Sequence, residues 1–353
     1  MTRISMFRAT CAATTLGLLA MSSAVAAAAL AVDHDYDSYA TPTVAAKVAT
    51  GRTIALYCVG NGSPTVVLTA GAGDWASTWR KVQGQIGKTT RACAWDRAGF
   101  GFSSPSNAVQ DVVHTEADLE AALSAAKIAG PYVLVGHSLG SYETMLFADR
   151  RPKDVVGIVL VDPSFPDQFR VLTKAYPDVA KIQLAIQARN IHDMGGCIAG
   201  VRSGAMKHGN VGWADCTNDD PAYPAALRQR LSRLADDPRR LETQLSYTKS
   251  EIADGEMVIN AHRHYGIVPL TILTAQDTPD LPEAIAPKAT IVEMKAMQAH
   301  GWVEGHEQMA ALSSRGRNVI VAGTTHYIQL IKPDTVTEAT TQVVQEARVK
   351  PVH

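Results

Sequence analysis

The stretch Tyr132-Val133-Leu134-Val135-Gly136-His137-Ser138-Leu139-Gly140 joins a short apolar run to a Gly-x-Ser-x-Gly motif. The residues from 138 to 149 have the composition of a helix that ends before Pro152. A serine between a strand and a helix sits on a sharp turn that exposes its hydroxyl. The two glycines fit such a turn, which has no room for bulky Cβ groups. We interpret Ser138 as a nucleophile; the alternative is an ordinary helix-capping serine.

Apolar, strand-like runs alternate with helical segments on both sides of this motif. Strands are expected at 52–59, 65–69, 90–95, 132–135, 155–161, 270–274 and 318–322, and helices at 79–86, 115–128, 138–149 and 334–347. This alternation predicts an α/β fold with a mostly parallel sheet and helices on both of its faces.

One region interrupts the alternation and suggests the domain organisation. Residues 164–266 have few strand signals but contain helical stretches at 225–234 and 241–252, which predicts a helical cap inserted in the core. The core would comprise 32–163 and 267–353, beginning with a polar, irregular linker at 32–43.

The first 31 residues differ from the rest of the chain. Arg3 and Arg8 precede an Ala/Leu-rich apolar stretch that reaches Ala31, the pattern of a secretory signal peptide. An uncleaved membrane anchor is the alternative. No later run of eighteen residues is apolar, so no stable membrane span is expected after signal removal, and the mature protein should be secreted or periplasmic.

Net charge and cysteine content bear on nucleic-acid binding, disulfides and metal sites. The 353 residues have a formal net charge of −1, so nucleic acid is not an expected partner. Four cysteines remain after the predicted signal, an even number that suggests disulfides in an exported protein, although buried free thiols are the alternative. Sequence alone allows three pairings among Cys58, Cys93, Cys197 and Cys216. No Cys-x-x-Cys or His/Cys cluster has zinc-ligand spacing, so no zinc site is expected. The nucleophilic mechanism considered next requires neither a metal nor an organic cofactor.

A serine hydroxyl needs a base, and the base needs an orienting carboxylate. His326 follows the last expected strand and is the candidate base. The carboxylate is expected after the strand at 270–274, where Asp277 is favoured over Asp280; Asp162, one strand earlier, is a further alternative. Three other histidines are assigned to the cap or to helix surfaces: His262, His264 and His306.

The developing oxyanion needs two backbone N–H donors. Leu139, directly after the nucleophile, is one candidate, and Ala72 in the small-residue loop after the strand at 65–69 is the other. Trp75 and His137 are expected to line the substrate pocket.

Four segments in this order resemble the α/β-hydrolase superfamily, in particular its exported esterase and proline-iminopeptidase-like branch. They are 58–68, the Asp-Arg-x-Gly-x-Gly-x-Ser-like segment 96–103, the motif at 136–140, and 325–327 with Pro333. The resemblance implies an eight-stranded sheet. Two departures exist: the acid loop lacks the usual Gly-x-x-Asp, and the oxyanion loop begins Ala-Gly rather than His-Gly.

The resemblance also has implications for pairing and activity. The family's strand order places Cys58 beside Cys93, which leaves Cys197 and Cys216 to link parts of the cap. The implied activity is hydrolysis of a small carboxylic ester through an acyl-enzyme. The alternatives are an aminopeptidase, whose substrate amine would be held by a cap carboxylate such as Asp219 or Asp220, a perhydrolase, and a non-catalytic binding protein. Dehalogenation is disfavoured because the motif carries Ser rather than Asp. The sequence does not indicate an oligomeric state.

Overall fold

The structure is a computed structural model that describes residues 33–48, 51–207, 209–210, 212–217, 220–278 and 287–349. The predicted signal peptide, together with Asp219 and Asp280, lies outside these described residues.

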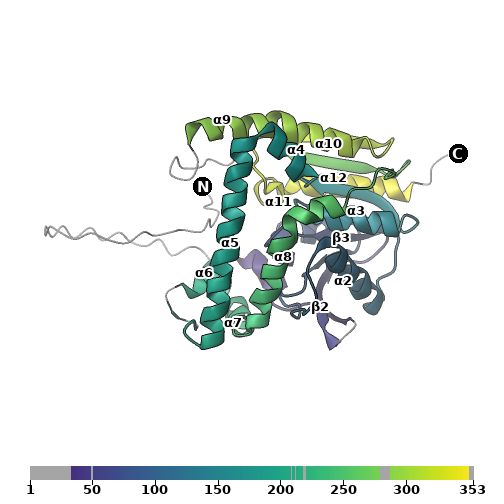
Figure 1. The fold of residues 1–353 in the computed structure, drawn as a ribbon. Coiled ribbons are helices and arrows are strands. Elements are labelled where there is room, and N and C mark those ends of the chain that lie inside the picture. The colour runs from purple at the N-terminus through teal and green to yellow at the C-terminus, as the bar shows by residue number, and fades with distance from the viewer. Residues whose placement is uncertain are drawn as a thin grey trace, which may run out of the picture.

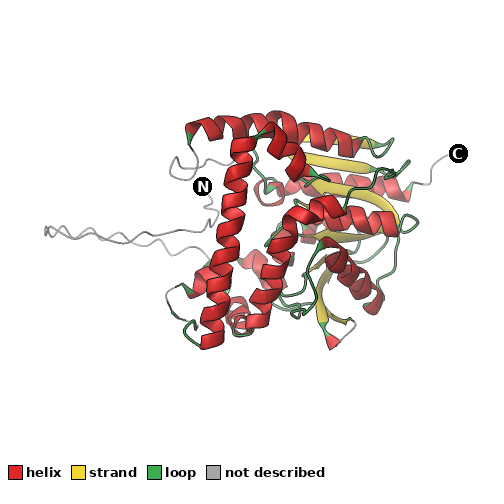
Figure 2. Cartoon of the chain, in the orientation of Figure 1, coloured by secondary structure: helices red, strands yellow, loops and turns green. Residues whose placement is uncertain are grey.

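A single sheet of eight strands organises the described chain (Figure 2). Its strands are β1 (Val44–Lys47), β2 (Thr53–Val59), β3 (Thr65–Thr69), β4 (Ala92–Trp95), β5 (Tyr132–His137), β6 (Val155–Val161), β7 (Leu270–Ala275) and β8 (Gly316–Val321). Their order across the sheet is β1-β2-β4-β3-β5-β6-β7-β8. Strand β2 is antiparallel to both neighbours, and β4 through β8 run parallel. The mostly parallel eight-stranded sheet is therefore confirmed.

Helices cover both faces of the sheet, as predicted. One face carries α2 (Val112–Ala125), α3 (Gly140–Arg150) and α10 (Val303–Ala310), and the other carries α1 (Gln83–Ile86), α11 (Ile328–Ile331) and α12 (Pro333–Arg348). Side chains along a strand alternate between faces. Accordingly, Leu134 joins one apolar cluster, while Val133 and Val135 join the other. A buried strand with two apolar faces explains the continuous apolar run that precedes Ser138.

Five described helices lie between β6 and β7, in the region predicted as a cap. They are α4 (Gln168–Ala175), α5 (Pro177–Ser203), α6 (Trp213–Thr217), α7 (Ala225–Ala235) and α8 (Pro238–Met257). The long helix α5 packs against α8, and the two are seen as the teal and green helices of Figure 1. After β7, α9 (Lys288–Ala296) and the π-helical η4 (Met297–Trp302) lead into α10.

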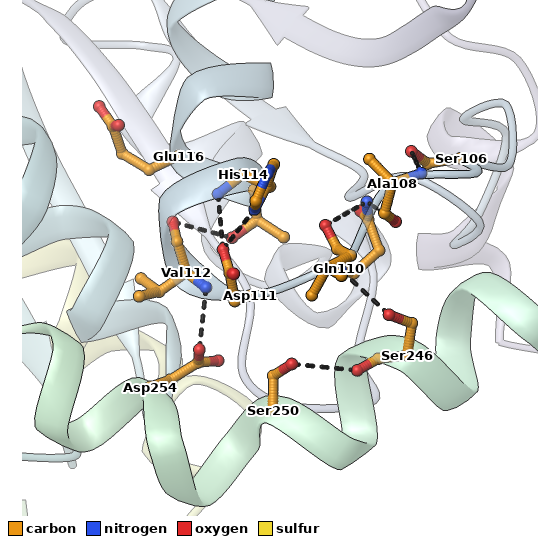
Figure 3. Close-up of polar contacts among 12 residues, drawn as sticks. Ser106, Ala108, Gln110, Asp111, Val112, His114, Glu116, Ser246, Ser250 and Asp254 are labelled. Carbon is orange, nitrogen blue, oxygen red and sulfur yellow. Dashed lines mark hydrogen bonds and ion pairs between the residues drawn. The ribbon is translucent and has the colours of Figure 1, made fainter.

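Side chains of helix α8 form hydrogen bonds with the core at the beginning of α2, as Figure 3 shows. Asp254 accepts a hydrogen bond from the Val112 N–H at 3.0 Å, and the Ser246 hydroxyl accepts one from the Gln110 N–H at 3.1 Å. The first N–H groups of a helix have no partner within the helix. Polar side chains of α8 therefore satisfy backbone groups that would otherwise be buried without partners.

The segment at 32–43 was predicted to be an irregular linker, and this prediction is wrong for its described part. Residues His34–Tyr39 form the short helix η1, whose Tyr36 and Tyr39 are buried. The Asp33 N–H donates to the Ala222 carbonyl, and the Asp33 carboxylate pairs with Arg80 at 3.0 Å. Burial of two aromatic rings outweighs the polar composition that suggested a linker.

Both disulfide pairings implied by the resemblance are present. Cys58 and Cys93 are directly opposite each other on β2 and β4, with Cα atoms 4.1 Å apart. Cys197 and Cys216 join α5 to α6. Among the described helices, none combines the length and the apolar character that crossing a bilayer requires.

Candidate active site

Ser138 lies at the sharp turn between β5 and α3, with a left-handed φ of +51°. The neighbouring glycines are required by close backbone approach. A Cβ at Gly140 would lie 2.5 Å from the Ala70 carbonyl oxygen, and one at Gly136 would lie 2.8 Å from the Gly140 carbonyl oxygen. Any side chain at either glycine would push the turn away from its neighbours.

The imidazole of His326 lies beside this serine. His326 belongs to the loop between β8 and α11, and its Nε2 is 2.8 Å from the Ser138 Oγ. This is a hydrogen-bond distance between groups separated by 188 residues of sequence. The two atoms that were predicted to meet therefore do so.

The carboxylate on the other side of the imidazole is that of Asp162. Its Oδ2 lies 2.6 Å from the His326 Nδ1. Its Oδ1 accepts hydrogen bonds from the Ala275 N–H at 3.0 Å and from the Trp302 indole N–H at 3.1 Å. The carboxylate is buried, and both of its oxygens have donors.

The prediction that Asp277 fills this position is wrong. Asp277 is exposed, and its backbone N–H donates to the Thr324 carbonyl. Sheet order explains the difference: β6 lies next to β5, and the last residue of β6, Val161, pairs with His137. The residue after β6 therefore lies beside the serine turn, whereas Asp277 follows β7, one strand further away. Asp280 is outside the described residues.

Asp162 is suited to remain charged despite its burial. Burial alone would raise the pKa of the Asp162 carboxyl, but the hydrogen bond from His326 and the attraction of its imidazolium form outweigh burial, and the pKa is lowered. A charged carboxylate holds the imidazole with its proton on Nδ1 and leaves Nε2 free to accept one.

Two backbone N–H groups were predicted to bind the oxyanion. Leu139 directly precedes α3, and Ala72 lies in the loop after β3. Within the described residues, neither N–H donates a hydrogen bond to the protein. Their assignment as oxyanion donors stays a prediction, with which the absence of an acceptor among the described residues is compatible.

His137 is buried, although it was predicted to line the substrate pocket. Its ring is 1% exposed, and its Nε2 is 3.0 Å from the His326 carbonyl oxygen, to which it donates. Burial, reinforced by the charge of His326, lowers the pKa of His137 to about 3. A neutral His137 therefore supports the loop that carries His326 through this hydrogen bond. His137 is the last residue of β5, which has an apolar run at 132–135, and this position could have indicated burial.

Trp75 lines a cavity of about 60 Å³, together with Gly73, Tyr223 and Leu231. Its indole N–H donates to the Tyr223 hydroxyl at 3.3 Å. A larger cavity, about 420 Å³, is lined by His262, Arg263 and His264 among others. Val155, the first residue of β6, also lines it, so it lies at the end of the sheet opposite Ser138.

His306 was assigned to a surface and is instead fully buried. Its Nδ1 contacts the Thr274 hydroxyl at 2.6 Å, and its Nε2 contacts the Pro163 carbonyl at 2.8 Å. Burial lowers its pKa, so it is a neutral support beside Asp162.

The sequence interpretation missed Trp302 and Asp74. Trp302 binds Asp162, as described above. Asp74 follows the Ala72 loop, and its Oδ2 is buried, 4.0 Å from the His137 Nδ1. Burial raises the pKa of Asp74 to about 6. Among the described residues, no group of three or more His, Cys, Asp or Glu is arranged to hold a metal ion.

The chain is similar to several known proteins. The Bacillus subtilis (strain 168) protein YqjL is 35% identical over 108 residues, which are 31% of this chain and 43% of YqjL. The curated relatives are thus matched over less than half of their length.

Two solved structures share the fold at low identity. The haloalkane dehalogenase DatA from Agrobacterium tumefaciens C58 has a TM-score of 0.61 at 17% identity, over 88% of this chain and 99% of that one. A thermophilic esterase from Thermogutta terrifontis has a TM-score of 0.52 at 16% identity, over 87% and 98%. The model of the alpha/beta hydrolase family matches residues 66–339. This match covers most of the chain, which therefore belongs to the alpha/beta hydrolase family.

Proposed function

We propose that this protein is a serine hydrolase that cleaves small carboxylic esters through an acyl-enzyme. The observation that carries the proposal is the continuous contact from Ser138 through His326 to Asp162, with distances of 2.8 and 2.6 Å. A buried carboxylate, an imidazole and a partly exposed serine in this geometry can activate the serine hydroxyl as a nucleophile.

In the first step, the Ser138 oxygen attacks the ester carbonyl while His326 Nε2 takes its proton. The carbonyl oxygen gains negative charge, which the N–H groups of Leu139 and Ala72 stabilise. His326 then gives the proton to the departing alcohol as the C–O bond breaks. The acyl group remains on Ser138 as an ester.

In the second step, His326 takes a proton from water, whose oxygen attacks the acyl carbon. The proton returns to the Ser138 oxygen when the acid leaves. This two-step reaction needs a covalent intermediate that water can cleave. Displacement of a halide by Ser138 would leave an ether, which has no carbonyl for water to attack, so we do not extend dehalogenase activity from DatA to this chain.

We also propose that the protein works outside the reducing cytoplasm. The two disulfides and the apolar, Arg-led N-terminal stretch support this proposal. Disulfides persist mainly in oxidising compartments.

A fluorophosphonate probe tests the nucleophile directly. We expect it to label the protein at Ser138 and to abolish hydrolysis of p-nitrophenyl esters. Ser138→Ala should lose both properties, whereas Ser124→Ala, at an exposed serine of α2, should keep both. Labelling of Ser138→Ala at the native rate, or equal ester hydrolysis by that variant, would overturn the proposal.

A substrate panel separates esters from amides. We expect faster turnover of p-nitrophenyl acetate than of aminoacyl p-nitroanilides. Among the cap carboxylates considered for holding an amine, Asp220 accepts the N–H of Ala222 in its own turn. Preferential cleavage of the anilides would replace the esterase proposal with an aminopeptidase.

A further inference from the structure

Arg97 is a buried cation beside the candidate active site, in the loop that follows β4. Its Nη1 donates to the Gly71 carbonyl at 3.0 Å, and its Nη2 donates to the Ala70 carbonyl at 2.7 Å. Its Nε and Nη2 also bind the two carboxylate oxygens of Glu143, at 2.5 and 3.1 Å. The guanidinium therefore links a backbone loop to a helix.

The two partners of Arg97 belong to the two segments that carry the proposed oxyanion donors. Ala70 and Gly71 directly precede Ala72 in the loop after β3. Glu143 lies in the first turn of α3, the helix that Leu139 precedes. A single side chain thus fixes the distance between these segments.

Peptide geometry connects the Arg97 contact to the donor itself. The Gly71 carbonyl and the Ala72 N–H belong to one planar peptide unit. In a trans peptide, these two groups point in opposite directions. A hydrogen bond that fixes the direction of the Gly71 carbonyl therefore fixes the direction of the Ala72 N–H.

We infer that Arg97, held by Glu143, is a positioning residue that aims the Ala72 N–H at the oxyanion. The inference rests on the proposed serine hydrolase function. Arg97 touches neither Ser138 nor His326 through a hydrogen bond. It acts through the loop backbone, and its planar fork reaches two carbonyls and a carboxylate at once, which the point charge of a lysine cannot do.

The surroundings keep this ion pair rigid. Glu143 also accepts a hydrogen bond from the Thr115 hydroxyl at 3.0 Å. The Tyr247 ring of α8 lies over the guanidinium, with its centre 5.0 Å from Cζ. Both charged side chains are 2% exposed, so water does not compete for their hydrogen bonds.

The test removes the ion pair without leaving a buried charge unpaired. Arg97→Met combined with Glu143→Leu replaces both charges with apolar side chains of similar size. Arg263→Met combined with Asp149→Leu is the control, because Arg263 and Asp149 form another ion pair of the core, with N and O 2.8 Å apart. Arg263 is buried and Asp149 is partly buried, and both line the cavity at the opposite end of the sheet.

Two measurements distinguish positioning from general destabilisation. The first is the division of the effect between kcat and KM for p-nitrophenyl acetate. The second is the inhibition constant of an alkyl trifluoromethyl ketone, which forms an oxyanion on the serine. For the Arg97 double variant, we expect kcat to fall by about 10²–10³, the usual effect of losing one oxyanion donor, with little change in KM. The inhibition constant should rise in parallel.

The control double variant should keep both values close to native, even if its melting temperature falls. A folded Arg97 double variant with native kcat and native ketone inhibition would overturn the inference, and so would equal losses in the control. If the Arg97 double variant does not fold, the same two measurements are made on Arg97→Lys, which keeps a charge opposite Glu143. We then expect kcat to fall and the inhibition constant to rise, and native values of both would overturn the inference. Failure of the proposed function is distinguished by the native protein, which would then not react with the fluorophosphonate at Ser138.

Discussion

Asp162→Asn is the substitution with the sharpest expected effect on catalysis. The asparagine oxygen can keep the place of Oδ1, where it accepts from the N–H groups of Ala275 and Trp302. A flipped amide would set its NH₂ against these two donors, so the orientation is fixed. The NH₂ then replaces Oδ2, 2.6 Å from the His326 Nδ1.

This exchange reverses the polarity of the imidazole. An amide NH₂ donates to Nδ1, so the neutral ring must carry its proton on Nε2. Nε2 then faces the Ser138 hydroxyl with a proton and cannot accept another. The corresponding change in a known Ser-His-Asp enzyme lowers kcat about 10⁴-fold, which corresponds to roughly 5 kcal/mol of transition-state stabilisation. We expect a loss of about 10³–10⁴ here.

The assay is kcat and KM for p-nitrophenyl acetate, with circular dichroism to verify the fold. Asp277→Asn is the matched control and should retain native kcat, because Asp277 is exposed and uses its backbone in the contact with Thr324. The reasoning is refuted if Asp162→Asn keeps native kcat, or if Asp277→Asn shows the larger loss.

Three further predictions concern the turn, a disulfide and the cap. Gly140→Ala should lower kcat at least about 10-fold, because its Cβ would lie 2.5 Å from the Ala70 carbonyl oxygen. Gly84→Ala, which has open space at its Cβ, should keep the native kcat, and equal kcat values for the two variants would contradict this prediction. Replacing Cys58 and Cys93 with alanine should lower the free energy of unfolding by about 2–4 kcal/mol, measured by urea denaturation of the oxidised proteins, and an unchanged midpoint would count against the expectation. Burial raises the pKa of Asp254 from 3.8 to about 7, so its contribution to stability is present below about pH 4 and is lost as pH rises toward 7. The melting temperature of the native protein should therefore fall relative to that of Asp254→Asn across this range, and parallel curves would show that the carboxyl does not titrate as expected.

The fold was predictable because its signals are local. Apolar runs marked every strand except β1, and the glycines around Ser138 marked the turn where the chain passes from strand to helix. The opposed positions of Cys58 and Cys93 followed from the family's strand order. In each case, the information lies within a few residues or in a known topology.

The carboxylate that contacts His326 was mispredicted because its position depends on the order of the strands in the sheet. Asp277 was favoured because it lies close to the end of the strand at 270–274, but Asp162 follows the strand that lies beside β5. Asp162 also has a left-handed φ of +41°, which sequence spacing does not reveal in a non-glycine residue. Its donors, Ala275 and Trp302, come from segments more than a hundred residues away.

Long-range contacts also explain the other differences. The role of Arg97 depends on carbonyl groups of a separate loop, and backbone acceptors have no residue-specific pattern. The burial of Tyr36 depends on Tyr223, whose ring centre lies 4.7 Å away although 187 residues separate the two in sequence. Such contacts are decided by packing rather than by local composition.

Capture of the acyl-enzyme tests the central claim most directly. The protein would be mixed with a p-nitrophenyl ester, quenched in acid during the first turnover, and analysed by peptide mass spectrometry. We predict an added acyl mass on the peptide that contains Ser138, and no such mass in Ser138→Ala. Steady ester turnover with no acyl group on Ser138, or with the acyl group on another residue, would contradict the proposed mechanism.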